Sequence, residues 1–318
     1  MDLLPSKNST SYYKGNLHGH SNHSDGALKP NEVINEYKNL GYDFTCLSEH
    51  LWKGEKFANE VVLDTTNLNE NNFIVIPSAE LHCKGKQYVN NGLWHIVANG
   101  LPVDFKCADD EERAPEMIQR AIDSGAFVTI AHPEWYKLTF DECMSVSHAH
   151  GVEIYNHSCH IEAARGFGTA TADYLLEENK KIFLTATVDY LLEENKKILL
   201  TATDDSHFRM ADAGGGWVMV ASENFNERSI LDALKMGKYY SSTGVDILKF
   251  EMQNNLVKVV SSPAEHITLV GQGARSLSEN GNNITEAIFD LNNIDTNWFR
   301  VTIIDNFGRF AWSNPIWL

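Results

Sequence analysis

Between residues 12 and 243, short apolar runs alternate with helix-like segments, and this alternation constrains the fold more than any other feature of the chain. The runs at 44–50 and 127–132 have the length of buried strands. Residues 30–41 carry apolar side chains at helical spacing, with proline at the start and glycine at the end. Such alternation predicts parallel strands joined by crossover helices.

Ligand-type side chains, among them His50, Glu80 and His132, lie at or near the C-terminal ends of these apolar runs. In a (βα) barrel those ends gather at one face, where active sites lie. A doubly wound open sheet is the competing architecture, and it would bring fewer of these side chains around one centre. We therefore expect residues 1–243 to form an α/β barrel with a polar cluster at one face.

The pattern changes near Gly244. From there to Leu318, strand-like segments such as 247–252, 256–260 and 266–270 predominate, and Asn254-Asn255 provides a turn. The sequence therefore predicts a small antiparallel β domain at residues 244–318, with few candidate catalytic groups.

The formal net charge of the chain is -17. Such a surface repels polyanions, which argues against general nucleic-acid binding and against binding to anionic membranes. A small phosphorylated substrate remains compatible with it, because bound metal ions reverse the sign of the charge locally. The sequence carries no signal for an oligomeric state.

Five cysteines occur, and none forms a C-x-x-C pair. This usage argues against a disulfide framework or a structural zinc ribbon and favours reduced thiols. The N-terminus lacks an apolar signal core, and no apolar run approaches the length of about 20 residues that spans a bilayer. We therefore expect a cytoplasmic protein.

Residues 171–186 (TADYLLEENKKIFLTA) are nearly repeated by residues 187–202 (TVDYLLEENKKILLTA). With only two copies, the repeat indicates a local tandem duplication rather than a solenoid. Only the second copy leads directly into Asp204-Asp205-Ser206-His207. We therefore expect residues 198–203 to take the strand position in the barrel, and residues 182–187 to be displaced or absorbed into a helix.

His18 and His20 are separated by one residue, and Asp205 and His207 repeat this spacing. Side chains at i and i+2 of a strand point to the same side, so each pair can converge on one ion. The H-x-H pair alone is a weak signal, but Asp25 and the later D-x-H make it more specific. Further ligand types close or lie within apolar segments, namely His50, Glu80, His95 and His132. Burying so many imidazoles and carboxylates unpaired would be costly, and metal coordination removes that cost.

Six motifs follow one another in a recognisable order: residues 18–26 (HGHSNHSDG), 47–50 (LSEH), 77–80 (PSAE), 94–96 (WHI), 131–133 (AHP) and 204–207 (DDSH). As a set they resemble the polymerase and histidinol phosphatase (PHP) superfamily, over residues 16 to 240. The resemblance implies a distorted (βα)7, TIM-like barrel of the PHP type that holds two or three divalent ions.

The resemblance also implies three ligand clusters. The first metal would be held by the four residues that we expect to be catalytic, His18, His20, Glu80 and Asp205. Glu80 would bridge to a second metal, which His95 and His132 also bind. A third metal would be held by Asp25, His50 and His207, although this site is incomplete in some relatives. At the variable motif position, His23 is a candidate to replace or assist Asp25. Asp204 points to the opposite strand face from Asp205, which predicts that it either supports a ligand from behind or has a structural role.

Histidine and carboxylate ligands suit zinc, manganese or iron, and the many histidines favour zinc. The ions would clamp a phosphoryl group and activate hydroxide, so we expect hydrolysis of a small phosphorylated metabolite or nucleotide. Two alternatives stay open at this point. The same site would suit a metallohydrolase that cleaves a C–N or C–O bond, and a non-catalytic metal-binding module is the other reading.

Overall fold

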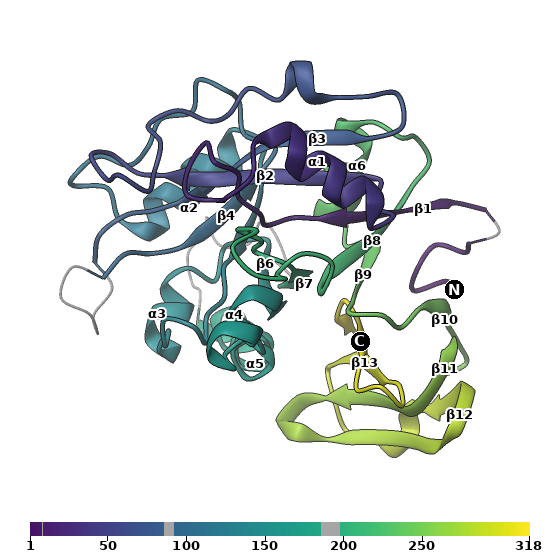
Figure 1. The fold of residues 1–318 in the computed structure, drawn as a ribbon. Helices are drawn as coiled ribbons and strands as arrows, with labels where there is room; N and C mark the ends of the chain where they lie inside the picture. The colour runs from purple at the N-terminus through teal and green to yellow at the C-terminus, as the bar shows by residue number, and fades with distance from the viewer. Residues whose placement is uncertain (8, 86–91, 186–197) are drawn as a thin grey trace.

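A computed structural model describes residues 1–7, 9–85, 92–185 and 198–318. It shows a mixed α/β fold with one large sheet and an antiparallel β region at the C-terminal end (Figure 1). The first half of the chain contains β1 (Ser11–Asn16), α1 (Pro30–Asn39), β2 (Phe44–Leu51), η1 (Thr66–Leu68), β3 (Ile74–Leu81), β4 (Ile96–Asn99), α2 (Ala114–Asp123), β5 (Phe127–Ile130), α3 (Phe140–Ser145), β6 (Gly151–Asn156) and α4 (His157–Ala163).

The second half contains α5 (Thr169–Thr185), β7 (Leu199–Thr203), β8 (Trp217–Ser222), α6 (Glu227–Lys235), β9 (Tyr239–Ser242), β10 (Ile247–Gln253), β11 (Leu256–Gly271), η3 (Gln272–Ala274), β12 (Ser276–Asp290), η4 (Leu291–Asn293), β13 (Trp298–Ile304), β14 (Phe310–Ser313) and β15 (Ile316–Trp317). The helix expected at 30–41 is present as α1. No helix in the described residues is long and apolar enough to span a membrane.

The strands of the N-terminal part are not all parallel. Strands β1, β2 and β3 pair in parallel, and so do β5, β6 and β7. In contrast, β4 is antiparallel to both β3 and β5, and β8 is antiparallel to β1. The prediction of uniformly parallel strands was therefore wrong at β4 and β8. The described residues between β3 and β4, and those between β7 and β8, contain no helix, and a parallel return requires a crossover connection.

Backbone contacts join the two segments that follow β1 and β7. The Asp205 amide donates to the carbonyl oxygen of His18 at 2.8 Å, and the His20 amide donates to the carbonyl of Ser206 at 2.8 Å. Gly19 and Ser206 form a parallel bridge. These contacts place the H-x-H and D-x-H motifs side by side.

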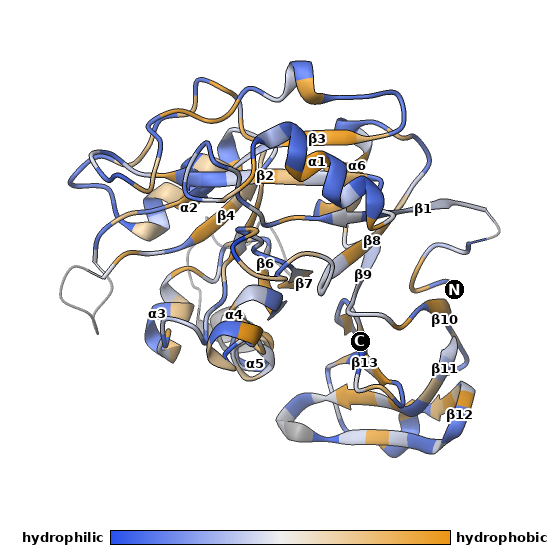
Figure 2. Ribbon diagram, viewed as in Figure 1, coloured by the Kyte–Doolittle hydropathy of each residue, from blue (hydrophilic) through white to orange (hydrophobic). Residues whose placement is uncertain are grey.

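Most strands around the site, although not β1, are buried on both faces. Every residue of β2 is buried, which is typical of a strand covered by helices or by other strands on each side. Figure 2 shows β3 and β4 as mostly apolar strands, and nearly all of their residues are buried. Helix α6 covers part of this sheet, because Ile230 and Leu234 pack in one cluster with Phe44 and Phe127. The chain therefore holds the strand ends, and the side chains beside them, on a rigid support.

The C-terminal region is antiparallel, as the sequence predicts. Two of the expected strands, 256–260 and 266–270, are parts of one long strand, β11, which pairs with β12 through register shifts near Ala264. Strand β14 pairs with β9, so backbone hydrogen bonding continues from this region into the rest of the sheet. The domain division at 243/244 stays a prediction.

The duplicated segment folds as the sequence predicts wherever it is described. Residues 182–185 of the first copy belong to α5, and the second copy forms β7 beside β6. Residues 186–187, which the same prediction covers, lie outside the described residues. Two contacts attach α5 to the C-terminal region. Arg300 makes a two-pronged ion pair with Asp173, at 2.8 Å for each bond, and the Gly273 amide donates to Glu177 at 2.7 Å.

Deleting residues 171–186 should leave a folded, metal-binding protein. Strand β7 is untouched, and the second copy supplies Asp189 and Glu193 in place of Asp173 and Glu177. The main cost is Val188 in place of the buried Ala172, an overpacking change of about 1–3 kcal/mol. We expect the melting temperature to fall by less than about 10 °C, as measured by circular dichroism. Aggregation, or loss of bound metal, would show that the extra copy is structurally required.

Candidate metal centre

The predicted ligands lie just beyond the strand ends more often than on the strands. Strand β1 ends at Asn16, so His18 and His20 follow it, and the bridge at Gly19 keeps this segment aligned with Ser206. Asp205 likewise follows β7 and has a positive φ of 54°. The two histidine rings lie 5.3 Å apart. The convergence expected from the i, i+2 spacing therefore occurs, in bridged loop ends rather than within strands.

The first cluster is fully assembled around two carboxylates. Nε2 of His18 lies 3.2 Å from Asp205 Oδ1 and 3.5 Å from Glu80 Oε2. Nε2 of His20 lies 3.1 Å and 3.6 Å from the same two oxygens. All four side chains are buried. Nitrogen and oxygen ligands of a tetrahedral zinc ion are separated by about 3.3 Å, given bonds of about 2.0–2.1 Å, so this spacing suits a cation.

Glu80 also reaches the second cluster with its other oxygen. Glu80 Oε1 lies 2.6 Å from Nδ1 of His95 and 3.1 Å from Nε2 of His132. The same carboxylate thus faces His18 and His20 on one side and His95 and His132 on the other. This is the position that a bridging ligand requires.

The third cluster is as compact as the other two. Nε2 of His50 and Nε2 of His207 each lie 3.4 Å from Asp25 Oδ1. Nδ1 of His207 lies 2.9 Å from the carbonyl oxygen of Asp205, which can only accept a hydrogen bond, so Nδ1 is the donor and Nε2 is left for a ligand. His23, the candidate substitute for Asp25, is exposed and belongs to none of the ligand groups found among the described residues.

Two buried atoms test whether this cluster fits metal ions. Within the described part of the chain, Nε2 of His18 and Oδ1 of Asp25 have no hydrogen-bond partner. Buried polar atoms without partners are costly, and each of these two faces other ligand-type atoms. A divalent cation would satisfy both. All nine predicted ligands fall into groups whose ligand atoms lie within 4.8 Å of one another. Their role as ligands stays a proposal.

The surroundings of His18 and His20 shift the pKa values of these two histidines in opposite directions. Burial by itself would lower the pKa of His18, but Asp205, Glu153 and Glu80 raise it well above its ordinary value. Burial lowers the pKa of His20 to about 3, helped by the neighbouring His50 and His207. In the metal-free protein His20 is therefore neutral, as a ligand must be, whereas His18 has to lose a proton when a cation binds.

Sequence reasoning missed Glu153, which supports the first two clusters. Its Oε1 accepts a hydrogen bond from Nδ1 of His18 at 2.7 Å, and its Oε2 accepts from the His132 amide at 2.7 Å. A carboxylate behind a metal-binding histidine fixes the ring orientation and raises the basicity of the ligand atom. The available signal was a glutamate among the apolar residues of the segment that forms β6. His82, which contacts His50 of the third cluster at 2.8 Å, was missed as well.

Asp204 has the structural role that the sequence predicts. Its carboxylate accepts backbone hydrogen bonds from Gly214, Gly215 and Gly216, each at 2.8 Å, and one from the hydroxyl of Tyr37 at 3.1 Å. Burial raises its pKa to about 6, while the three glycine amides oppose that rise. This network fixes the segment that carries Asp205 and His207.

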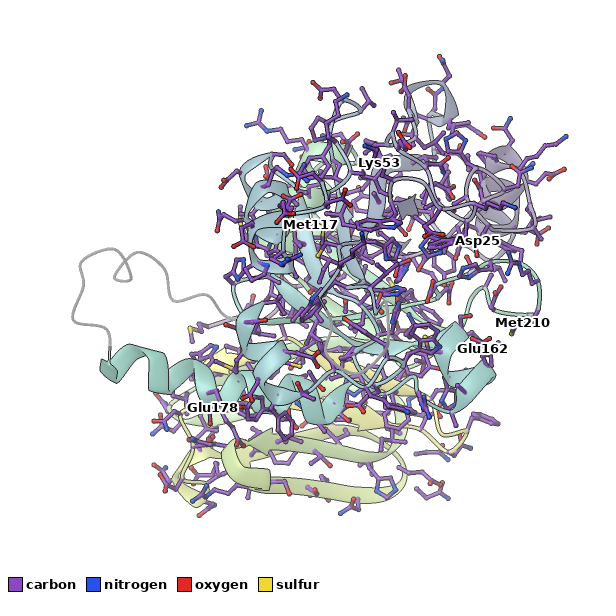
Figure 3. All side chains as sticks on the ribbon, turned by 90° about the vertical axis from the view of Figure 1, so that its left-hand side faces the viewer. Asp25, Lys53, Met117, Glu162, Glu178 and Met210 are labelled. Atoms are coloured by element: carbon purple, nitrogen blue, oxygen red, sulfur yellow. The ribbon has the colours of Figure 1, made fainter. Side chains whose placement is uncertain are left out.

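A pocket of about 420 Å³ opens beside the cluster. Figure 3 shows Asp25, Glu162 and Met210, three of its lining residues, on one side of the molecule. Arg209 is the one arginine or lysine among the described residues that line it, and its guanidinium contacts Asp25. Phe57 and Trp135 add aromatic surface. The pocket thus joins ligand-type atoms, one cation and two aromatic rings.

Comparison with known proteins supports the fold. No family model and no curated protein matches the chain. The structure is similar to a two-domain protein from Bacteroides vulgatus that contains a predicted PHP-like metal-dependent phosphoesterase. That likeness has a TM-score of 0.52 and 15% sequence identity, and it covers 99% of this chain and 98% of the other. A candidate metal-dependent phosphoesterase from Bifidobacterium adolescentis matches with a TM-score of 0.41 and 13% identity, over 69% of this chain and 96% of that one.

The first of these comparisons covers nearly the whole chain, including the C-terminal β region. This chain therefore resembles PHP-like proteins in its fold as well as in the motifs from residues 18–26 to 204–207.

Proposed function

We propose that this protein is a metal-dependent phosphoesterase that hydrolyses a small phosphorylated metabolite or nucleotide. The observation that carries the proposal is the position of Glu80, whose two oxygens face two ligand clusters within one buried centre. Two or three divalent ions bound there would activate hydroxide and offset the charge of the phosphoryl oxygens. Zinc is the proposed metal because the ligands are mostly histidines, and manganese and iron are the alternatives.

Other side chains around the centre orient the proposed ligands or line the pocket for the substrate. Glu153 orients His18, and Asp204 fixes the segment that carries Asp205 and His207. Arg209 offers the pocket a positive charge that an anionic substrate can meet. Phe57 and Trp135 give the pocket apolar surface, which suits the organic part of a small substrate.

We also propose membership of the PHP superfamily, with residues 1–243 as its distorted (βα)7 barrel. The motif order supports membership, and the hydrogen bonds between 18–20 and 205–206 support closure of the strands. A hydrophobic cluster centred on the C-terminal strands supports a separate small β domain at 244–318. The five free cysteines suit a cytoplasmic protein.

A phosphatase screen tests the function directly. The metal-free protein would be reloaded with Zn²⁺ or Mn²⁺ and tested on p-nitrophenyl phosphate and on a panel of phosphorylated metabolites and nucleotides. We expect metal-dependent phosphate release, which chelator abolishes and Asp205→Asn greatly reduces. A metal-loaded protein that releases phosphate from no ester would contradict the proposal and direct attention to C–N or C–O bonds.

Arg209→Gln should raise KM for the best phosphate ester by about 10-fold or more, with a smaller change in kcat. A hydrogen bond to a charged group is worth about 1.5–3 kcal/mol, and 1.4 kcal/mol is tenfold in affinity. Arg209→Lys should recover part of the loss because it keeps the charge. The matched control is Arg228→Gln on α6, where the side chain is 93% exposed and away from the pocket. Unchanged KM in the Arg209 variant would remove this residue from substrate binding.

A further inference from the structure

His82 is buried beside the third ligand cluster, and none of the sequence motifs includes it. It lies at the end of β3, directly after Leu81, and its ring spans the space between the Trp94 carbonyl oxygen and His50. Nδ1 of His82 is 2.9 Å from that oxygen, and Nε2 of His82 is 2.8 Å from Nδ1 of His50. The three groups therefore form a chain of hydrogen bonds that leads to a proposed ligand.

The direction of each hydrogen bond follows from the chemistry of the partners. A carbonyl oxygen only accepts, so Nδ1 of His82 donates to Trp94. Nδ1 of His50 lies 2.7 Å from the carboxylate oxygen Oε2 of Glu80, which also accepts, so Nδ1 of His50 carries the hydrogen. Nε2 of His82 must then be the acceptor. A cation at the third site needs Nε2 of His50 free of hydrogen, and this is the atom that lies 3.4 Å from Asp25 Oδ1.

The same atoms of His50, Glu80 and His82 lie close enough together to be taken for a ligand set of their own. The hydrogen bonds of His82 argue against that reading. Nδ1 of His82 donates to the Trp94 carbonyl oxygen and Nε2 of His82 accepts from Nδ1 of His50, so neither of the two facing nitrogens is free to bind an ion. The distances from Asp25 to His50 and to His207, both 3.4 Å, match ligand spacing.

We propose that His82 is a positioning residue that fixes His50 in the tautomer that presents Nε2 to the third metal site. When cations bind the carboxylate oxygens of Glu80, those oxygens no longer accept the hydrogen on Nδ1 of His50. Nε2 of His82 is then the acceptor that remains for it. His82 thereby determines whether the third site fills, and so whether the protein binds two ions or three. This inference rests on the proposed metal centre but not on the bond that is hydrolysed.

Two polar variants separate the hydrogen bond from simple packing. His82→Gln keeps an acceptor for His50, whereas His82→Asn has a shorter amide that reaches toward Trp94 and leaves His50 without its acceptor. Chelator-treated protein would be titrated with Zn²⁺ by calorimetry, and bound zinc per chain counted by mass spectrometry. We expect three ions in the parent protein, a 10- to 100-fold weaker last ion in the asparagine variant, and recovery of most of this loss in the glutamine variant.

A second readout is independent of ion counting. In zinc-loaded protein with ¹⁵N-labelled histidine, long-range NMR correlations report which ring nitrogen of His50 carries hydrogen, with His50→Gln to assign the signals. We expect the Nδ1–H form in the parent and in His82→Gln, and a mixture of forms in His82→Asn. His150→Gln, at a histidine outside the ligand groups, is the matched control. Equal zinc affinity in all variants, or a glutamine variant as weak as the asparagine variant, would overturn the proposal.

Discussion

Glu80→Gln should reduce kcat/KM for phosphate esters by more than about 100-fold and should lower the metal content at the same time. Supporting groups behind a ligand already contribute about 10–100-fold, and Glu80 contacts two ligand clusters itself. Its Oε2 lies 3.5 Å from Nε2 of His18, and its Oε1 lies 3.1 Å from Nε2 of His132. Glutamine keeps the shape, but it loses the charge and one of the two oxygens that a bridging ligand needs.

The measurement pairs steady-state kinetics with metal analysis at several zinc concentrations. Glu142→Gln is the matched control, because Glu142 is also buried but caps α3 away from the ligand groups. Glutamine is acceptable in that capping position, so this variant should behave like the parent. If Glu80→Gln retained full metal content and activity, Glu80 would not be a bridging ligand, and the proposed arrangement of the centre would be wrong.

Asp204→Ala should cost about 3–6 kcal/mol in the free energy of unfolding, a large part of the 5–15 kcal/mol that stabilises an ordinary protein. The substitution leaves the backbone amides of Gly214, Gly215 and Gly216 without their acceptor. A buried donor that loses its partner costs about 1–3 kcal/mol; this full cost applies to the Gly216 amide, and the partly buried Gly214 and Gly215 amides lose less. Urea unfolding of the metal-free protein measures the loss without the contribution of bound ions.

Two further variants identify the cause. Asp204→Asn keeps one acceptor oxygen and should lose less, while Tyr42→Phe removes a hydroxyl that donates to Asp204 and should cost about 1 kcal/mol or less. Asp232→Ala, on the exposed side of α6, should leave stability nearly unchanged. If Asp204→Ala lost metal but kept the stability of the parent, Asp204 would be a ligand rather than a structural residue.

The sequence was informative about the ligands because their chemistry is local. An H-x-H pair followed by Asp25, and a later D-x-H, identify ligand types from their spacing, and the structure brings these residues together. The orientation of β4 and β8 was not predictable in the same way. Strand direction depends on the connection before each strand, and the segment before β4 contains no helical pattern to exclude a direct antiparallel return.

The residues that orient the ligands could not be predicted from the sequence, for a different reason. Glu153 and His82 lie in or beside buried strands, and in the sequence each looks like one polar residue among apolar neighbours. Their importance comes from partners far along the chain: Glu153 contacts His18, and His82 contacts His50. A pattern within one segment contains no information about such pairs. The ligands were therefore predictable from motifs, while the groups that orient them required the fold.

The tandem repeat has an evolutionary consequence. Residues 182–185 of the first copy are helical and belong to α5, so these positions do not need the residue types that a buried strand favours. Residues 199–203 of the second copy remain in β7 and lead to Asp205, so they keep those requirements. Selection therefore acts on nearly identical peptides in opposite ways. In descendants of this gene we expect the first copy to drift toward strong helix formers, or to be lost by recombination, while the second keeps its β-branched and aliphatic residues.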